Sequence, residues 1–274
     1  MALRSPGREP RIRAKLNAKF TQSAQKFIYR YTTRRLDADD AEEVVFLNYG
    51  YEEDPPMSVP LAEVDEPNRY AIQLYHSTAT QADLRGKRVL EVGCGHGGGA
   101  AYLARALQPS SYTGLDVNPV GIEYCRKTHD VAGLDFVQGD AEDLPFGDQS
   151  FDAVLNVESS HLYPRFPRFL EEVARVLAPG GHFLYTDARA AHAIAGWEAA
   201  LAAAPLRLCT QRVINTEVRR GMATTLQQWQ NVIDRVTPRP LRRVVRDFAP
   251  AQRAYDDLGS DGSSEYRMYS FVKE

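Results

Sequence analysis

Cysteine is scarce in this sequence of 274 residues. The three cysteines, Cys94, Cys125 and Cys209, lie far apart along the chain. An odd and scattered set provides neither a disulfide framework nor the close pairing of a zinc site. The six histidines are scattered in the same way, without the short spacing of metal ligands. We therefore expect reduced, structural cysteines and no metal centre.

Long hydrophobic runs are also absent. No stretch approaches the roughly 18 consecutive apolar residues that a membrane-spanning helix needs. The Arg-rich start of the chain lacks the apolar block of a secretory signal. With 43% hydrophobic and 25% charged residues, the composition is that of a globular protein with one large domain. These features predict a cytoplasmic protein.

Neither sign of charge dominates the whole chain, because the net charge is only −3. The broad positive field of a nucleic-acid-binding protein is therefore not expected. The charges are nevertheless segregated: residues 1–36 contain a single acid, Glu9, among many Lys and Arg, whereas every charged residue in 37–68 is acidic. Such a basic arm can contact an anionic membrane, at about 1 kcal/mol per charge. A solvated leader and an organellar transit peptide are the alternatives.

Residues 87–274 contain short runs of β-forming residues that alternate with helical stretches. This alternation predicts a parallel sheet with crossover helices. We expect strands at 88–92, 111–116, 134–138, 151–156 and 181–186, with two more at 243–248 and 265–273. We expect helices at 98–106, 119–129 and 166–177.

Two further segments flank or interrupt this alternation. Residues 37–86 contain several prolines and a predicted helix at 67–82, which indicates an N-terminal lid. Residues 190–236 carry apolar residues mostly at helical spacing, which predicts a helical cap inserted after the fifth strand. The expected organisation is a basic arm (1–36), a lid (37–86) and a main domain (87–274) that includes the cap (190–236).

A glycine-rich loop follows the first predicted strand in the segment VLEVGCGHGGG, residues 89–99. Gly93, Gly95 and Gly98 fit the GxGxxG spacing, which also occurs in nicotinamide-dependent oxidoreductases. Glu91 precedes the first glycine by two residues, where it can meet a cationic ligand group and would repel a pyrophosphate. S-adenosylmethionine has an amino-acid tail, a sulfonium and no phosphate, so it fits this loop better. The oxidoreductase remains an alternative.

Acidic residues also follow the next two predicted strands. Asp116 ends the second strand at the distance from the glycine loop where an acid can chelate ribose hydroxyls. Asp140 follows the third strand and can accept from an adenine amino group, with the Ala141 backbone at the ring edge; a helix N-cap is its alternative role. The full cofactor-binding set that we expect is Glu91, Gly93, Gly95, Asp116, Asn118, Asp140, Ala141 and Asn156.

The segments EVGCGHG, GLDVN, GDAEDLPF and ARVLAPGG occur in this order within residues 87–186. This ordered set resembles the class I S-adenosylmethionine-dependent methyltransferases. YEEDPPM, DEPNRY, LNVESSHLYPRF and EYRMYSFVK are similar to segments of the mycobacterial phthiotriolone and phenolphthiotriolone dimycocerosate methyltransferases and related O-methyltransferases of fatty acids and glycolipids. The resemblance implies a Rossmann-like α/β fold, with a mostly parallel seven-stranded sheet whose last strand is antiparallel. It also implies a lipid-type acceptor.

His161 and Asp187 are the residues that we expect to act on the acceptor. His161 lies just past the fourth predicted strand and Asp187 just past the fifth, and ligands of open α/β sheets bind at these strand ends. A histidine held by a carboxylate can remove the proton of an alcohol acceptor. A histidine that merely shapes the pocket and a helix-capping aspartate are the alternatives. Glu158 is a competing base or a metal-type ligand.

The identity of the acceptor stays open at this point. A fatty carboxylate is already deprotonated at neutral pH and needs no base, whereas a long-chain lipid hydroxyl or a glycolipid sugar hydroxyl does. A module that binds S-adenosylmethionine without catalysis is a further alternative. No pattern in the sequence indicates an oligomeric state.

Overall fold

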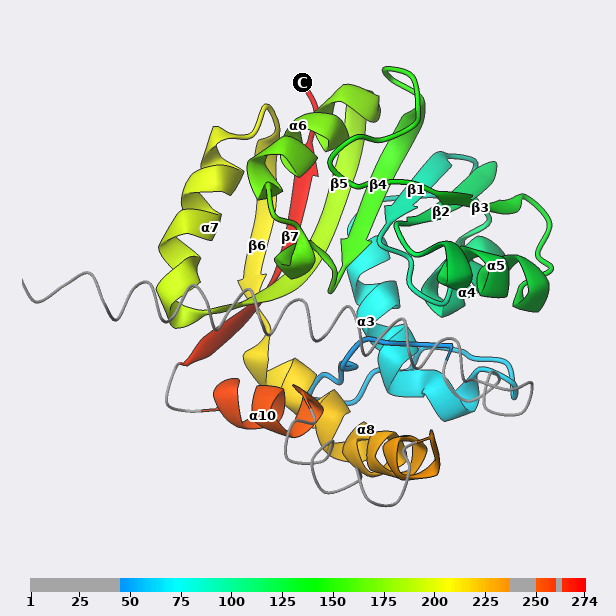
Figure 1. Cartoon of the computed structure of the whole chain (residues 1–274), viewed down its shortest axis with the longest axis vertical. Coiled ribbons are helices and arrows are strands. Elements are labelled where there is room, and N and C mark those ends of the chain that lie inside the picture. The colour runs from blue at the N-terminus through cyan, green and yellow to red at the C-terminus, as the bar shows by residue number, and fades with distance from the viewer. Residues whose placement is uncertain (1–44, 237–249, 260–262) are drawn as a thin grey trace, which may run out of the picture.

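A computed structural model of the chain describes residues 45–236, 250–259 and 263–274. Within these residues seven strands form one sheet in the order β3-β2-β1-β4-β5-β7-β6 (Figure 1). All pairs are parallel except those of β7, which runs antiparallel to both β5 and β6. This confirms the predicted Rossmann-like sheet. The strands are β1 (Arg88–Val92), β2 (Ser111–Asp116), β3 (Leu134–Gln138), β4 (Phe151–Val157), β5 (Leu177–Ala190), β6 (Arg207–Val213) and β7 (Ser264–Val272).

Helices cover both faces of the sheet, as is usual where the strands are parallel. The first buried cluster joins one face to α3, α4 and α5, and the second joins the other face to α6 and α7. The helices and 3₁₀ turns are η1 (Glu66–Asn68), α3 (Arg69–Ala79), α4 (Gly98–Leu107), α5 (Pro119–Thr128), η2 (Ser160–Leu162), α6 (Phe166–Val176), α7 (Ala191–Ala203), α8 (Asn215–Val236) and α10 (Pro250–Asp257).

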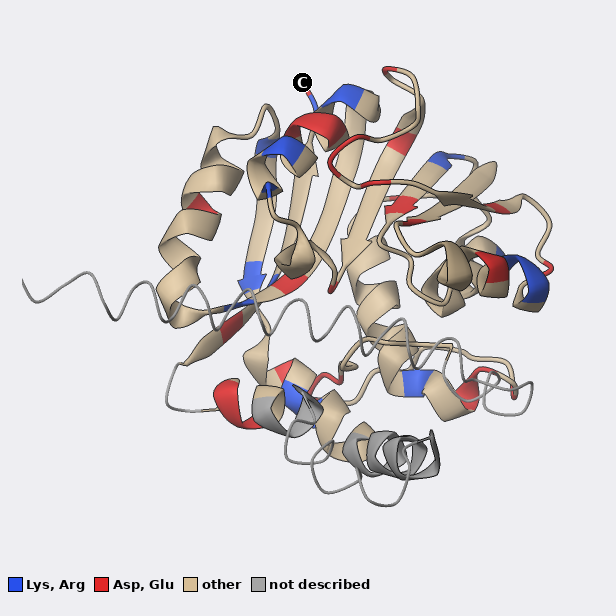
Figure 2. Ribbon diagram, viewed as in Figure 1, with Lys and Arg blue, Asp and Glu red and all other residues tan. Residues whose placement is uncertain are grey.

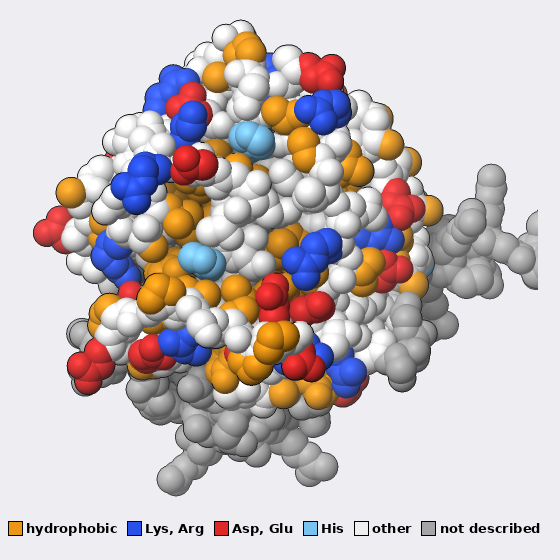
Figure 3. All heavy atoms as spheres, turned by 180° about the vertical axis from the view of Figure 1, so that it is seen from behind, with side chains coloured by type: hydrophobic (Ala, Val, Ile, Leu, Met, Phe, Trp, Pro, Cys, Tyr) orange, Lys and Arg blue, Asp and Glu red, His pale blue; other side chains and the backbone are white. Residues whose placement is uncertain are grey.

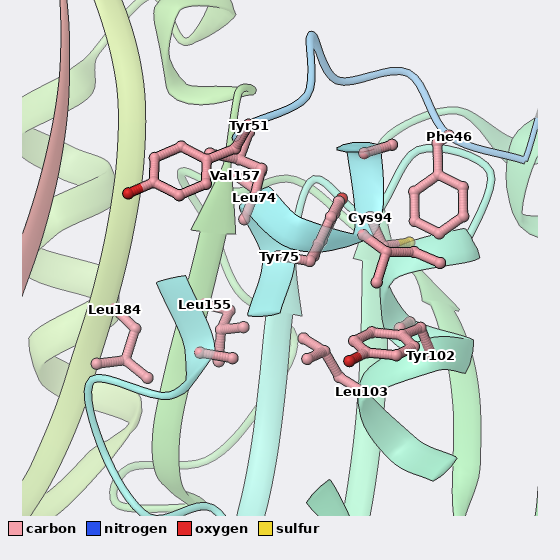
Figure 4. Packing of buried hydrophobic residues seen from close by; sticks show 14 of the residues in the cluster. Phe46, Tyr51, Leu74, Tyr75, Cys94, Tyr102, Leu103, Leu155, Val157 and Leu184 are labelled. Carbon is pink, nitrogen blue, oxygen red and sulfur yellow. The ribbon is translucent and has the colours of Figure 1, made fainter. Parts of the chain in front are cut away.

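The carboxyl ends of the parallel strands are covered by residues 45–61 and by α8 and α10 (Figure 1). Residues 45–61 are part of the expected lid, 37–86, and are called the lid segment below. Backbone hydrogen bonds fix this segment to two helical regions: Tyr51 N–H donates to the Tyr70 carbonyl in α3, and Glu52 N–H donates to the Glu217 carbonyl in α8. The first buried cluster also extends into the lid segment, because it includes Phe46. This ring lies near Tyr75 of α3 and Cys94 of the glycine loop (Figure 4). The lid segment, α8 and α10 therefore lie over part of the carboxyl edge of the sheet.

Several predicted elements differ from the structure. Residues 190–236 are mostly helical, as expected, but β6 lies between α7 and α8 and interrupts the predicted cap. Its residues are exposed on both faces at the edge of the sheet, so the strand lacks the alternating apolar pattern that would have revealed it. β5 is also longer than predicted. The strand expected at 243–248 and the basic arm lie outside the described residues.

Basic and acidic residues both occur along the described helices and loops (Figure 2). The face opposite to that of Figure 1 shows hydrophobic side chains in small groups between charged ones (Figure 3). Across the described ranges no helix combines the length and the apolar character needed to cross a membrane.

Candidate active site

The glycine loop joins β1 to α4 and takes a shape that side chains would disturb. Gly93 has φ +78° and Gly95 φ +57°, in the left-handed region that favours glycine. A Cβ atom at Gly93 would lie 2.3 Å from Ser159 Oγ. The Gly93 and Cys94 N–H groups both donate to the Leu115 carbonyl, at 2.7 and 3.0 Å. The end of β2 and the segment after β4 therefore fix the loop from two sides.

Glu91 lies fully buried in β1, beneath this loop. The hydroxyl groups of Tyr75 and Tyr112 donate to its two carboxylate oxygens, at 3.0 and 2.8 Å. Burial raises the pKa of Glu91 to about 7, although the two phenol hydrogen bonds lower it. A cationic ligand group that approached Glu91 would thus share the carboxylate with two tyrosines. The sequence did not reveal these partners, because they come from α3 and β2.

Asp116 connects the glycine loop to the start of α5. Its carboxylate accepts from Gly95 N–H at 3.1 Å and from Asn118 N–H at 2.8 Å. Burial raises the pKa of Asp116 to about 6, against the lowering effect of these backbone hydrogen bonds. The structure therefore brings Gly95, Asp116 and Asn118, all expected to bind the cofactor, together at the carboxyl ends of β1 and β2.

Asn118 and its neighbour Val117 add two features that suit a ligand. Asn118 caps α5 by accepting from Val120 N–H at 3.2 Å, while its Nδ2 is buried without a hydrogen-bond partner among the described residues. Val117 is 60% exposed although it is apolar. An unpaired buried donor beside an exposed apolar side chain suits a planar ring with hydrogen-bonding edges. Sequence reasoning missed Val117, whose signal was its place next to the acid that ends β2.

Asp140 forms a turn at the end of β3. Its Oδ1 accepts from Glu142 N–H at 2.9 Å, and no helix begins there, so the alternative role of helix cap is wrong. The Gly139 N–H donates to the Asp116 carbonyl at 3.0 Å, which places this turn next to the end of β2. Asp140 is exposed, whereas Ala141 is buried.

Asn156 is fully buried within β4 and supports the loop from below. Its Nδ2 donates to the Val92 carbonyl at 2.8 Å and to Ser159 Oγ at 2.7 Å. Its Oδ1 is buried and has no partner among the residues that the structure describes. The contacts of Asn156 thus hold the end of β1 against the segment that follows β4.

His161 and Asp187 meet at the carboxyl ends of β4 and β5. His161 Nδ1 lies 2.9 Å from Asp187 Oδ1, and His161 N–H donates to Asp187 Oδ2 at 2.9 Å. The Asp187 side chain is only 1% exposed, whereas that of His161 is 37% exposed. Asp187 lies inside β5 and caps no helix. A carboxylate that holds Nδ1 favours the tautomer with a basic Nε2.

The ionisation of Asp187 is fixed by its surroundings. Burial alone would raise the pKa of Asp187, but the nearby charge of Arg189 and the charge and hydrogen bonds of His161 and Ser160 hold that pKa well below its usual range. Arg189 Nη1 lies 3.0 Å from Asp187 Oδ2. Sequence reasoning missed Arg189 and Ser160; their only signal was proximity along the chain to the two expected residues.

Glu158 links the lid to β7 near this pair. It has φ +49°, which is unusual for a residue with a side chain. Its carboxylate accepts from Tyr49 N–H at 3.0 Å and from the Tyr266 hydroxyl at 2.5 Å. Burial raises the pKa of Glu158 to about 7, although both hydrogen bonds lower it. No group of His, Cys, Asp and Glu suited to a metal ion occurs within 45–236, 250–259 and 263–274.

Known proteins resemble this chain in both sequence and fold. A family model described as a methyltransferase domain matches residues 90–185. A fatty-acid O-methyltransferase of Mycolicibacterium smegmatis is 64% identical over 96% of this chain and 94% of its own length. A phthiotriol/phenolphthiotriol dimycocerosates methyltransferase of Mycobacterium tuberculosis is 55% identical over 92% of this chain and 94% of its own length.

Solved structures with lower sequence identity share the fold. The cyclase SpnF has a TM-score of 0.68 at 22% identity and covers 92% of this chain and 96% of its own. A geranyl diphosphate C-methyltransferase from Streptomyces coelicolor has a TM-score of 0.65 at 16% identity, with 91% and 97% covered. Because a cyclase shares this fold, the fold alone does not define the reaction.

The similar proteins of known activity indicate the reaction, which the fold alone does not. Their identity extends over nearly the whole chain, well beyond the GxGxxG spacing that had left a nicotinamide-dependent oxidoreductase open. The same match sets aside the module that binds its cofactor without catalysis. The chain therefore belongs to the same family as these mycobacterial enzymes and is a class I S-adenosylmethionine-dependent O-methyltransferase.

Proposed function

We propose that this enzyme methylates an oxygen atom of a lipid-type acceptor, either the carboxyl group of a fatty acid or the hydroxyl group of a long-chain lipid. The names of the two mycobacterial relatives support the acceptor class. The observation that carries the proposal for a hydroxyl is the 2.9 Å contact between His161 Nδ1 and Asp187 Oδ1. A sugar hydroxyl of a glycolipid is an acceptor of the same chemistry.

The cofactor would bind over the ends of β1, β2 and β3. When bound, S-adenosylmethionine supplies an electrophilic methyl group on a sulfonium. Asp116 would accept hydrogen bonds from the ribose hydroxyls, and Val117 would cover one face of the adenine ring. Asn118 Nδ2 would gain the partner that it lacks. Glu91, with its partners Tyr75 and Tyr112, would bind a cationic group of the cofactor. Asp140 and Ala141 would lie at the edge of the adenine ring.

The acceptor would bind over the ends of β4 and β5. Methyl transfer is an in-line displacement, so holding the acceptor oxygen in line with the methyl group supplies much of the rate. An alcohol also loses its proton, and His161 Nε2 would receive it while Asp187 stabilises the imidazolium. The new carbon–oxygen bond forms as the carbon–sulfur bond breaks, and the electron pair stays on sulfur.

The test compares two acceptor classes in the variant His161→Ala, with labelled S-adenosylmethionine as donor. For a long-chain alcohol we expect kcat to fall by about 10²- to 10⁴-fold, because general-base catalysis is lost. For a fatty acid we expect turnover close to that of the wild type, because the carboxylate needs no base. His192→Ala, at an exposed position of α7, is the matched control.

Undiminished turnover of the alcohol would exclude His161 as the base. An equal loss on both acceptors would assign it a structural role instead. Mass spectrometry of the products that form from lipid extracts identifies the acceptor and separates a fatty-acid ester, a lipid ether and a methylated sugar.

A further inference from the structure

Asp187 accepts an unusually large set of hydrogen bonds for one buried carboxylate. Besides the two from His161, its Oδ2 accepts from Ser160 Oγ at 2.6 Å and its Oδ1 from the Ala188 N–H at 2.8 Å. Arg189 Nη1 lies 3.0 Å from Oδ2 and forms an ion pair with it. A side chain held by this many donors cannot rotate without losing several of them. The orientation of Asp187 is therefore fixed.

The proton directions in this network can be assigned from its chemistry. Ser160 has one hydroxyl proton, and Asp187 is ionised and can only accept, so Ser160 donates to Asp187. The Tyr185 hydroxyl, 2.7 Å from Ser160 Oγ, must then donate to Ser160. Trp197 Nε1 in α7 donates to Tyr185 at 2.9 Å. Each group therefore donates to the next, from Trp197 in α7 through the Tyr185 and Ser160 hydroxyls to Asp187.

Arg189 is held in place by aromatic rings and by the same hydroxyl groups. Its guanidinium carbon lies 4.8 Å from the centre of the Trp197 ring and 5.4 Å from that of Phe166. Its Nη2 donates to Ser160 Oγ at 2.8 Å. The Arg189 side chain is nearly buried. Its charge cannot move away from Asp187 without breaking these contacts.

We propose that Arg189 and Ser160 are positioning residues for methyl transfer to hydroxyl acceptors, and that they act on His161 through Asp187. Ser160 fixes the direction of the carboxylate, and Arg189 offsets part of its charge. Without that offset, Asp187 would stabilise the imidazolium more strongly, and Glu158 is a second carboxylate whose charge acts on His161. This inference rests on the proposed role of His161 as base.

The test measures the pH profile of kcat/KM for a long-chain alcohol in Arg189→Gln, Arg189→Lys and Ser160→Ala. In Arg189→Gln we expect the acid limb of the profile to move up by about 0.5 to 1 pH unit, because a nearby positive charge is lost. Arg189→Lys keeps the positive charge, so its acid limb should stay at the wild-type pH. Ser160→Ala removes one hydrogen bond, so we expect it to lower kcat by about tenfold. Its acid limb should stay at the wild-type pH.

The matched control is Arg88→Gln. Arg88 also pairs with an aspartate, Asp152, at 2.8 Å, but at the amino end of β1 and far from the acceptor. Its profile should match that of the wild type. If Arg189→Gln does not fold, the lysine and Ser160 variants carry the test. An acid limb that stays at the wild-type pH in Arg189→Gln overturns the proposal, as does an equal loss of turnover on a fatty acid carboxylate.

A second readout does not depend on turnover. NMR titration of the ¹⁵N-labelled histidine rings, with the signals assigned through His161→Gln, follows His161 in the protein without acceptor. The midpoint of its titration should move to higher pH in Arg189→Gln and not in Arg88→Gln. If the wild type methylates no alcohol but this midpoint still moves, the hydroxyl acceptor is wrong and the effect of Arg189 on His161 stands. A midpoint that does not move in Arg189→Gln overturns the effect of Arg189 on His161.

Discussion

Buried carboxyl groups at the carboxyl edge of the sheet differ in the direction in which their surroundings shift the pKa. Burial raises the pKa of Glu91 to about 7 and that of Asp116 to about 6. Asp187 is equally buried, yet the charges of Arg189 and His161 keep its pKa low. Nearby cations therefore outweigh burial at Asp187, whereas the phenols beside Glu91 and the backbone amides beside Asp116 do not.

The variant Asp116→Asn tests the cofactor contact at the scale of one residue. It keeps the size of the side chain but removes the charged acceptor, so we expect the Kd for S-adenosylmethionine to rise about tenfold, or about 1.4 kcal/mol. In the wild type, affinity should also fall as the pH is lowered through about 6, because Asp116 becomes protonated there. Isothermal titration calorimetry between pH 5 and 8 measures both effects.

Asp152→Asn is the control for this prediction, since Asp152 lies at the start of β4 and bonds to Arg88. A Kd within twofold of the wild-type value in Asp116→Asn would contradict the assignment. So would a wild-type affinity that is constant across this pH range.

The sequence predicted which chemical groups line the site but not what holds them. Asp116, His161 and Asp187 were singled out because each lies at or just past the end of a predicted strand, and strand ends of a parallel sheet meet along one edge. The contacts of Tyr75 and Tyr112 with Glu91 were not predicted, because these residues lie 16 and 21 positions away from it in the chain. Side-chain pairing across elements leaves no periodic signal in one sequence.

At the scale of elements, the glycine loop depends on both its backbone shape and its lack of side chains. Gly93 and Gly180 have nearly the same φ, +78° and +76°. A Cβ at Gly93 would meet Ser159 Oγ at 2.3 Å, whereas a Cβ at Gly180 would meet nothing within 4 Å. The two glycines therefore separate the backbone requirement from the steric one.

We expect Gly180→Ala to lower the free energy of unfolding by about 1 to 2 kcal/mol, the usual cost of left-handed backbone with a Cβ. Gly93→Ala should cost about 1 to 3 kcal/mol more, because the new methyl group overlaps Ser159. Urea denaturation measures both variants. Equal losses at the two positions would show that the loop has room for a side chain, contrary to the structure.

Prediction from sequence succeeded best for the first three parallel strands. β1, β2 and β3 were predicted with the first and last residues that the structure has, because their runs of β-forming residues are bounded by glycine and polar turns. β6 was missed because its residues, RLCTQRV, are exposed on both faces and carry no alternation. Its pairing with β7 makes it a strand, and that partner lies far along the chain.

At the scale of the whole molecule, the residues expected to bind the methyl donor and those expected to act on the acceptor lie mostly on different strands. Most of the expected cofactor contacts lie at the ends of β1, β2 and β3, with Asn156 in β4, whereas the His161–Asp187 pair lies at the ends of β4 and β5. The lid spans both halves, since the Val45 carbonyl accepts from Gly98 N–H and Tyr49 N–H donates to Glu158. Donor and acceptor would thus meet beneath one covering segment.

The buried acids also predict how stability depends on pH. Glu91 and Glu158 both have a pKa raised from 4.5 to about 7, so the folded state binds protons more tightly than the unfolded state. Between about pH 4.5 and 7 these groups therefore make the free energy of unfolding fall as pH rises, by up to about 1.4 kcal/mol per pH unit for each group. Urea denaturation at several pH values measures this slope.

The variants Glu91→Gln and Glu158→Gln should each remove one share of that slope, because glutamine does not titrate. Glu171→Gln, at an exposed position of α6, should keep it. If the wild type and both buried variants show the same dependence on pH, the two acids do not control it.

The position of β7 also affects how the chain can fold while it is being synthesised. β7 lies between β5 and β6 in the sheet, although it follows both in the sequence. Until residues 264–272 are made, β5 has an open edge and β6 has no strand to join. At about 5 to 20 residues per second, the roughly 50 residues between β6 and β7 take about 3 to 10 seconds on the ribosome. During those seconds the nascent chain exposes an unpaired strand edge that a neighbouring nascent chain can bind.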